Sequence, residues 1–583
     1  MAITAALLAV ITYFEVLPAP ALLGTRILTN RGDPALLMWQ LTTQSSALAA
    51  GRLGDLLQGN IFYPHRDALA YSDSLISYLP VFSPVLWLSH NPLLAYNVTL
   101  YIGYLGGALA MYALATHVLG RGWPPLVAAV VFTASPLRSA TIDHLQLVGI
   151  AFALLALLFT MRLLEGGGWG DALGLGCCLG LAWLGTAYGA MMLALGLPVF
   201  VVAWCVAGRR RPSRGLVVRL AMASAVGGLV AAPTLPAYAR VQAAGLERRA
   251  DADITAVTAS SFTTLPPSVL YQALHVGGAD LPEQQALYPG LVLGVLVAWA
   301  LAAAAVERRS GRSRPGPARL RGYAVPLVAL ALVEATVLVG PNAGALSLAD
   351  RALRATVPGV ASLRGLGRFW LLGVAALALV AGRGAGRLHD RLASPWRAIV
   401  LAAVVLVAPL ETLAAHPVVG IALEPPRSTA NLNLRTLPAG PVMEMPPVQP
   451  GPVFAQTLGP RMVRSTIDGL PRVEGRSGTI PPDVLALING VRAFPDPATL
   501  DLMRAAGVRY VLVHAGPRSC ADLYGPDEAA EVIARLRDSP AVQRVIPAGA
   551  DSIIVLAAWT GGPAPAAPTA PVPPRPPYVC ADP

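Results

Sequence analysis

The feature that most constrains this chain is a series of apolar runs, each about as long as a lipid bilayer is thick. A spanning helix needs about 20 mostly apolar residues, and the sequence meets this criterion about eleven times. The runs lie at 2–23, 92–119, 123–139, 144–164, 169–187, 189–207, 215–238, 288–306, 322–340, 366–383 and 396–416. Only 13% of residues are charged, against about 25% in an average soluble domain. We therefore predict an all-α polytopic membrane domain.

The arginines between these runs predict which side of the membrane each connection faces. Short cytoplasmic loops are enriched in basic residues, and arginines gather at 209–214, 307–321 and 383–391. With alternate crossings, the segments 24–91 and 239–287 and the region after 416 lie on the outer side. An apolar stretch at 74–89, broken by two prolines, is expected to rest at the membrane interface. If that stretch crosses instead, the orientation of the N-terminal part reverses.

The region after the last apolar run has a different pattern. Around 501–514 a helical pattern ends at Gly507 and a β-rich buried segment follows, and a second such combination occupies about 526–559. We divide the chain into a transmembrane domain (1–420) with a large first outer loop (24–91), a small extracytoplasmic α/β domain (421–560) and a tail (561–583). The tail is rich in Pro and Ala and is expected to be disordered.

Several function classes find no support in the sequence. The net charge of +11 comes without a basic stripe interleaved with aromatic residues, so we expect no nucleic-acid partner. Phosphate-cradling GxxxxGK, HExxH and GxSxG motifs do not occur. The cysteines show no metal-ligand spacing, and Cys520 and Cys580 could pair if the C-terminal region faces an oxidising compartment.

Polar residues that bear on function gather on the predicted outer side. Asp33 directly follows the first apolar run and precedes a proline, so it either caps a helix or offers a carboxylate to a site. The other groups are His65 and Asp73, then Arg138, Asp143, His144 and Gln146, and finally Arg364 and Arg368. Ionisable residues at membrane depth are costly and usually functional, although Arg and His at the interface also pair with lipid headgroups. Two guanidiniums four residues apart suit a phosphate.

The segments that carry these residues are similar to those of a known superfamily. They are RGDP (31–34), NIFYPHRDALAYSD (60–73), DHLQL (143–147), SLRGLGRFWLLG (362–373), VMEMP (442–446), RSTIDGLPRVEGRSGTIPP (464–482) and LMRAAGVRYVLVH (502–514). With them the chain resembles the GT-C superfamily of polytopic glycosyltransferases, including oligosaccharyltransferase- and mannosyltransferase-like proteins and bacterial YfhO-like membrane proteins. The resemblance covers nearly the whole chain.

The resemblance implies an enzyme of the inner (cytoplasmic) membrane that moves a sugar from a polyprenyl-phosphate donor. The acceptor would be a glycan, lipid or protein at the outer face. A carboxylate in the first outer loop acts as the base in that family, which maps onto Asp33, with Asp143 and His144 as further catalytic candidates. Arg364 and Arg368 would stabilise the departing lipid phosphate. The remaining substrate-binding candidates are His65, Asp73, Arg138 and Gln146.

Two questions stay open at this point. Asp73 and Asp143 both fit as a second acidic partner, so a divalent metal is an open alternative, and no other cofactor is implied. A transporter or flippase of a lipid-linked glycan is a rival function, although we find no internal repeat of the kind many transporters show. A non-catalytic membrane scaffold is a third. The enzyme hypothesis expects Asp33, Asp143, His144 and Arg364 to meet in one outer-facing cavity.

Overall fold

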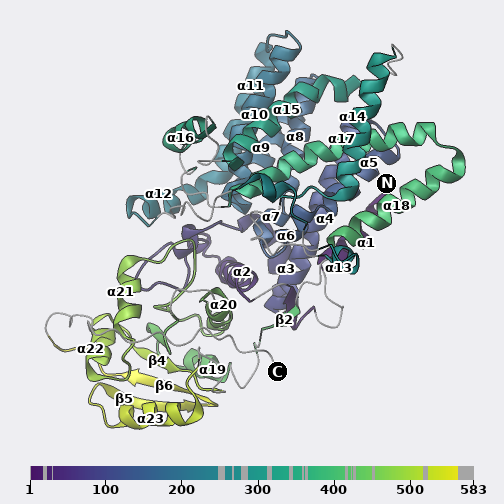
Figure 1. Ribbon diagram of the computed structural model, residues 1–583. Helices are drawn as coiled ribbons and strands as arrows, with labels where there is room; N and C mark the ends of the chain where they lie inside the picture. The colour runs from purple at the N-terminus through teal and green to yellow at the C-terminus, as the bar shows by residue number, and fades with distance from the viewer. Residues whose placement is uncertain are drawn as a thin grey trace.

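The computed structural model describes most of the chain, and every structural statement below refers to the part it describes. These residues are 2–16, 23–28, 31–246, 257–265, 268–276, 287–310, 318–339, 346–357, 360, 365–413, 418–421, 423, 428–448, 454–516 and 523–561. Arg364, Cys520, Cys580 and the tail from 562 lie outside them. A helical bundle occupies one end of the molecule and a small sheet with its helices the other (Figure 1).

Eight helical runs in the described residues are long and apolar enough to cross a membrane. They are α4 (Pro92–Leu119), α7 with α8 (Leu145–Val148 and Ala151–Leu164), α10 (Ala187–Ala207), α11 to α12 (Arg214–Ala231 and Leu235–Ala243), α14 (Leu291–Arg309), α15 (Ala318–Val339), α17 (Trp370–Arg391) and α18 (Ser394–Thr412). Each coincides with a predicted span. The protein is therefore a multi-pass membrane protein.

The other three predicted spans are shorter helices. They are α1 (Ala2–Val16), α5 (Trp123–Thr133) and α9 (Trp169–Gly185). Helix α5 ends early because Ser135 precedes Pro136 and adopts an extended conformation, as residues before proline prefer. The stretch at 74–89 forms a 3-10 turn (Ile76–Tyr78) and α3 (Leu79–Ser89), which packs on α2 (Asp33–Ala49) and α4. Short helices α6 (Pro136–Ala140), α13 (Val269–Ala273) and α16 (Leu346–Thr356) complete this part.

The C-terminal region contains a four-stranded sheet in the order β3-β4-β6-β5. The strands are β3 (Val442–Met445), β4 (Tyr510–Val513), β5 (Val542–Ala548) and β6 (Asp551–Leu556); β3 and β4 are parallel and the other neighbours antiparallel. The helices are α19 (Thr429–Arg435), α20 (Phe454–Ser465), α21 (Pro482–Gly490), α22 (Pro497–Ala505) and α23 (Pro526–Arg537). Gly507, at φ +81°, follows α22 and allows the turn into β4.

Pairs of secondary-structure elements join the C-terminal region to the N-terminal part of the chain. Strand β1 (Arg26–Leu28) pairs antiparallel with β2 (Val418–Gly420). Helix α20 lies against α2, and Figure 1 shows this pair between the helical bundle and the sheet. One continuous apolar core includes residues of α2, of the first outer loop and of the C-terminal sheet. The first outer loop and the C-terminal region therefore form one packed unit.

Replacing Gly459 by Val is expected to destabilise this junction by about 1–3 kcal/mol. A Cβ at this position of α20 would lie 2.2 Å from the carbonyl oxygen of Arg31 and 2.9 Å from the Cβ of Ala35. Backbone atoms cannot rotate away, so α20 must move off the start of α2. Thermal unfolding of the detergent-solubilised protein measures the loss. Gly54→Ala is the control because no atom lies within 4 Å of its added Cβ. An unchanged Tm for G459V would contradict the close crossing.

Candidate functional site

Asp33 lies at the start of α2, where the membrane helices meet the C-terminal region. Gly32 occupies the N-cap position and Asp33 is the first helical residue, so its side chain is not the helix cap. Its Oδ2 lies 2.9 Å from Nε2 of His144, and its Oδ1 pairs with Nη2 of Arg476. About a quarter of the side chain is exposed (24%), which leaves the carboxylate accessible to a ligand.

His144 lies between two carboxylates. It comes from the turn between α6 and α7, and its Nδ1 is 2.8 Å from Oδ1 of Asp143. Because both ring nitrogens face carboxylate oxygens, a doubly protonated imidazole can donate a hydrogen bond to each. The ring therefore holds Asp33 and Asp143 at a fixed separation and orients the Asp33 carboxylate.

The charges around Asp33 decide its ionisation. Burial raises the pKa of Asp33, but the charge of His144 and its hydrogen bond, together with those of Arg476, outweigh burial and hold the pKa far below its ordinary value. Asp33 is therefore ionised at neutral pH. A carboxylate stabilised this strongly is a weak proton acceptor while both cationic partners remain in place.

Gln146, two residues after His144, lines a mostly apolar pocket between the membrane helices. The pocket is small, and its wall includes Tyr78, Thr186, Gly189 and Met192. The Oε1 atom of Gln146 is buried and has no hydrogen-bond partner among the described residues. The pocket therefore has an apolar wall and one polar acceptor, Gln146, which is two residues from His144 in the sequence.

Arg368 contacts Tyr188, a close sequence neighbour of two residues in the pocket wall. Its guanidinium stacks over the ring of Tyr188 at 4.8 Å, and Tyr188 stands between Thr186 and Gly189 in the chain. The hydroxyl of Tyr188 also accepts a hydrogen bond from the amide of Gly365 at 3.1 Å. Arg364, the second predicted guanidinium of this pair, lies outside the described residues.

Three further predicted site residues have contacts away from the Asp33 cluster. Arg138 is buried inside the helical bundle, where its guanidinium stacks on Tyr104 at 3.9 Å. Asp73 accepts hydrogen bonds from Thr186 and from the amide of Ala187 at the start of α10. His65 pairs with Asp483 of the C-terminal region at 2.9 Å. The structure gives each of them a structural contact, and their contact with substrate stays a prediction.

Arg476 is the site residue that the sequence analysis did not single out. It lies within the segment 464–482, which the resemblance includes, but the segment alone gives no sign of a partner hundreds of residues earlier. Its one local signal is that it follows Arg472 and Glu474 at alternate positions of an extended segment. A contact between Arg476 and Asp33 depends entirely on how the C-terminal region packs on α2.

The described residues do not form a divalent-metal site. No group of three His, Cys, Asp or Glu side chains in this part of the chain converges on a common point. Asp33 and Asp143 face opposite nitrogens of His144, and the second oxygen of Asp33 faces a guanidinium. A cation at Asp33 would have to displace positively charged partners.

Solved structures with a similar fold are membrane glycosyltransferases. The arabinofuranosyltransferase AftD from Mycobacteria superposes with a TM-score of 0.53 at 17% identity over 96% of this chain and 40% of AftD. The archaeal oligosaccharyltransferase AglB from Archaeoglobus fulgidus gives 0.46 at 12% identity over 87% of this chain and 68% of AglB. The chain thus spans about two fifths of the length of AftD. Comparison with protein-family models and with curated proteins found no match. The likeness to AftD shows that the chain shares the fold of that protein.

Proposed function

We propose that the protein is a membrane glycosyltransferase that moves a sugar from a polyprenyl-phosphate donor to a glycan, lipid or protein acceptor. The reaction takes place at the outer face of the inner membrane, where the C-terminal domain lies. The observation that carries the proposal is the contact of Asp33, His144 and Arg476 at the junction of the helical bundle and the C-terminal region. The GT-C fold supports it.

In this proposal Asp33 is the general base. The acceptor oxygen attacks the anomeric carbon of the donor sugar as its proton passes to Asp33. The bond from the anomeric carbon to the phosphate oxygen breaks, and its electron pair leaves with the polyprenyl phosphate. A single displacement of this kind inverts the anomeric centre and needs no covalent enzyme intermediate. His144 keeps the carboxylate oriented through its contact with Oδ2.

The apolar pocket beside Gln146 is the proposed site of the first part of the donor's lipid chain. Its wall of Tyr78, Gly189 and Met192 offers apolar contact, as ligand pockets for apolar groups generally do. Arg368, whose guanidinium stacks on Tyr188, is a proposed contact for the donor phosphate. Gln146 connects the pocket to His144 through only one intervening residue.

Transfer from a lipid-linked donor is the expected result that distinguishes this function from transport. Purified protein in nanodiscs is supplied with a labelled sugar on polyprenyl phosphate, or with the same sugar on a nucleotide. We expect label to enter the acceptor from the lipid donor alone. In sealed proteoliposomes a flippase would instead move the labelled lipid across the bilayer without transfer, and a scaffold would do neither. Transfer from the nucleotide sugar alone would contradict the proposal.

A further inference from the structure

The segment that carries Arg476 is held on both of its edges. The amide of Val473 donates to a carbonyl of β3 at 3.0 Å, so the segment runs alongside the C-terminal sheet. On its other edge, the amide of Arg472 donates to the carbonyl of Asn60 at 2.6 Å, and the amide of Tyr63 donates to the carbonyl of Arg472 at 2.9 Å. The segment therefore bridges the sheet and the first outer loop by backbone hydrogen bonds.

The first outer loop is fixed in turn to α2. Asn60 accepts a hydrogen bond from the indole of Trp39 at 2.9 Å, and it donates to the hydroxyl of Ser465 on α20 at 3.1 Å. Trp39 lies on α2, the helix that begins at Asp33. The backbone that carries Arg476 and the helix that carries Asp33 are thus linked through Asn60, which is half-buried.

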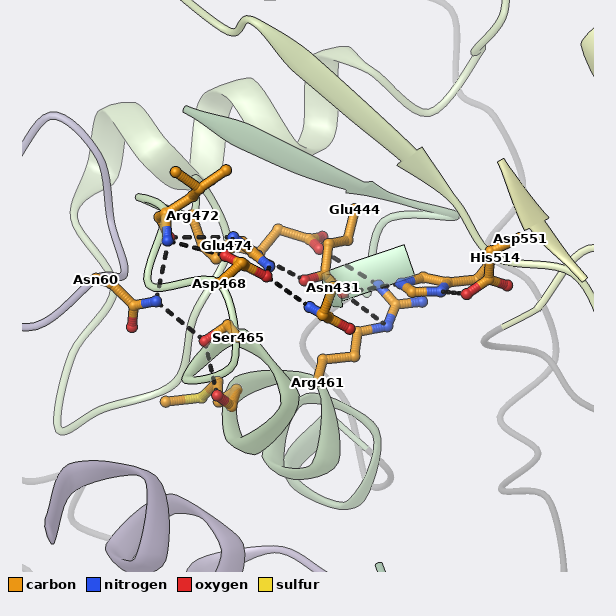
Figure 2. Close-up of polar contacts among 12 residues, drawn as sticks. Asn60, Asn431, Glu444, Arg461, Ser465, Asp468, Arg472, Glu474, His514 and Asp551 are labelled. Atoms are coloured by element: carbon orange, nitrogen blue, oxygen red, sulfur yellow. Dashed lines mark hydrogen bonds and ion pairs between the residues drawn. The ribbon is translucent and has the colours of Figure 1, made fainter. Parts of the chain in front are cut away.

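Buried charges hold the side chains of this segment (Figure 2). Arg472 donates to Glu444 at 2.8 Å and to Asp468 at 2.7 Å, and Glu444 also lies 2.9 Å from Nε2 of His514. All of these side chains are at most 6% exposed. A buried pair of this kind is rigid because separating its members leaves an uncompensated charge. Arg472 therefore anchors the segment four residues before Arg476.

Glu474 anchors the same segment two residues before Arg476. Its carboxyl accepts a hydrogen bond from the amide of Val448 at 2.9 Å and lies 3.4 Å from the guanidinium of Arg461. The next residue, Gly475, has no room for a side chain because a Cβ would lie 2.5 Å from that of Ile61. The contacts of Arg472, Glu474 and Gly475 therefore fix the backbone position of Arg476, whose side chain extends to Asp33.

The guanidinium of Arg476 has one nitrogen engaged and another available. Nη2 pairs with Oδ1 of Asp33, while Nη1 is buried and has no hydrogen-bond partner among the described residues. An unsatisfied buried donor costs free energy, so this nitrogen gains most from an acceptor brought by a ligand. About a fifth of the Arg476 side chain is exposed (21%), so a ligand bound at Asp33 can contact this side chain.

We propose that Arg476 is shared between Asp33 and the phosphate of the donor, so that donor binding draws the guanidinium from Asp33 and frees Oδ1 for the acceptor's proton. This inference rests on the function proposed above. When the donor is absent, Arg476 neutralises Asp33. When the donor is present, its phosphate takes the guanidinium, because Arg binds phosphate oxyanions bidentately. The C-terminal domain thereby completes the active site of the membrane domain.

The movement of Arg476 from Asp33 to the donor phosphate is consistent with the charges at each stage of the transfer step. The acceptor's hydroxyl proton passes to Oδ1 of Asp33 as the new bond to the anomeric carbon forms. The bond from that carbon to the phosphate oxygen breaks, and the phosphate leaves with one more negative charge. Arg476 then faces this additional charge. Loss of the Arg476 contact removes one cause of the low pKa of Asp33, so the carboxylate becomes a stronger base when the donor is bound.

The test is Arg476→Gln in the full-length protein in nanodiscs, with polyprenyl phosphate lacking a sugar as the binding probe. We expect the Kd for this lipid to rise by about 10–100-fold, as the loss of a charge-assisted hydrogen bond predicts. We expect kcat to fall by about 100-fold. The acidic limb of the kcat/KM profile should move to higher pH, because Asp33 loses a cation that lowers its pKa.

Controls separate this role from a structural one. Arg535→Gln is the matched control, because Arg535 lies on α23, is half exposed and pairs with Asp496 on the surface; we expect it to match wild type. Arg476→Lys keeps the charge and should retain part of the lipid affinity. If R476Q proves unstable, R476K provides the test instead. Unchanged Kd and an unchanged acidic limb for folded R476Q would overturn the sharing of Arg476. If R476Q shows this wild-type behaviour while D33N is inactive, the sharing of Arg476 is wrong but the proposed function still stands.

Discussion

Asp33→Asn is expected to lower sugar transfer by about 10²–10⁴-fold, the range that general-base catalysis contributes. Asparagine keeps the volume of the side chain but cannot take up the acceptor's proton. It also removes the anion that faces His144 and Arg476, so two positive groups lose their shared partner. The measurement is the initial rate of transfer from labelled polyprenyl-phosphate sugar in nanodiscs, with the Tm of each variant measured beside it.

Two further variants test whether the loss is specific to Asp33. Asp143→Asn changes the carboxylate on the other side of His144, so it should disturb the orientation of the ring and cause a smaller loss than D33N. Asp55→Asn is the surface control, because Asp55 is 47% exposed and pairs weakly with Arg52 at 3.8 Å. If D33N retains wild-type transfer with an unchanged Tm, Asp33 is not the base.

Glu444→Gln is expected to lower the free energy of unfolding by about 3–5 kcal/mol, the usual cost of removing one partner from a buried ion pair. Glu444 contacts Arg472 and His514 and lies 3.8 Å from Arg461. Burial, together with the charge of Glu444, raises the pKa of the neighbouring Glu474 to about 8, so Glu474 is largely neutral at pH 7 in the wild-type protein. Denaturant or thermal unfolding of the full-length protein at pH 7 measures the effect.

The same variant tests how the buried charges act on the site. Because Arg472 loses a partner in E444Q, the segment that carries Arg476 should loosen, and the affinity for polyprenyl phosphate should fall together with stability. Glu531→Gln on α23 is the matched control; its side chain is exposed, and surface changes usually alter stability by no more than about 0.5 kcal/mol. Wild-type stability of E444Q would show that the cluster does not hold this part of the protein.

Much of the helical bundle follows from the lengths of the apolar runs. A bilayer requires every backbone polar group of a crossing segment to be satisfied within it, so a long apolar run leaves helix as the main choice. For this reason eight predicted spans coincide with long helices in the described residues. The run at 123–139 is interrupted after Thr133, because apolar composition alone does not show where a proline ends a helix.

The candidate site can be predicted only in part from the sequence. The segments that carry Asp33 and His144 were expected on the same side of the membrane, and the structure brings the two side chains to 2.9 Å. Their catalytic roles stay predictions. Arg138 and Asp73 were chosen for the same reason, yet Arg138 stacks on Tyr104 inside the bundle and Asp73 contacts the start of α10. Being on the same side of the membrane does not specify which charged residues face a common space.

By itself, the sequence determined that the chain is a membrane protein, where most of its long helices lie, and that a polar region with strands follows them. These properties depend on local composition and periodicity, because the preference of each residue for water or for the bilayer acts locally. The partner of Asp33 was decided only by tertiary structure. Arg476 reaches it because backbone pairing at Asn60 and the buried charges around Glu444 place a segment that runs alongside the C-terminal sheet next to the start of α2. Such contacts arise from packing between distant segments, and no local pattern encodes them.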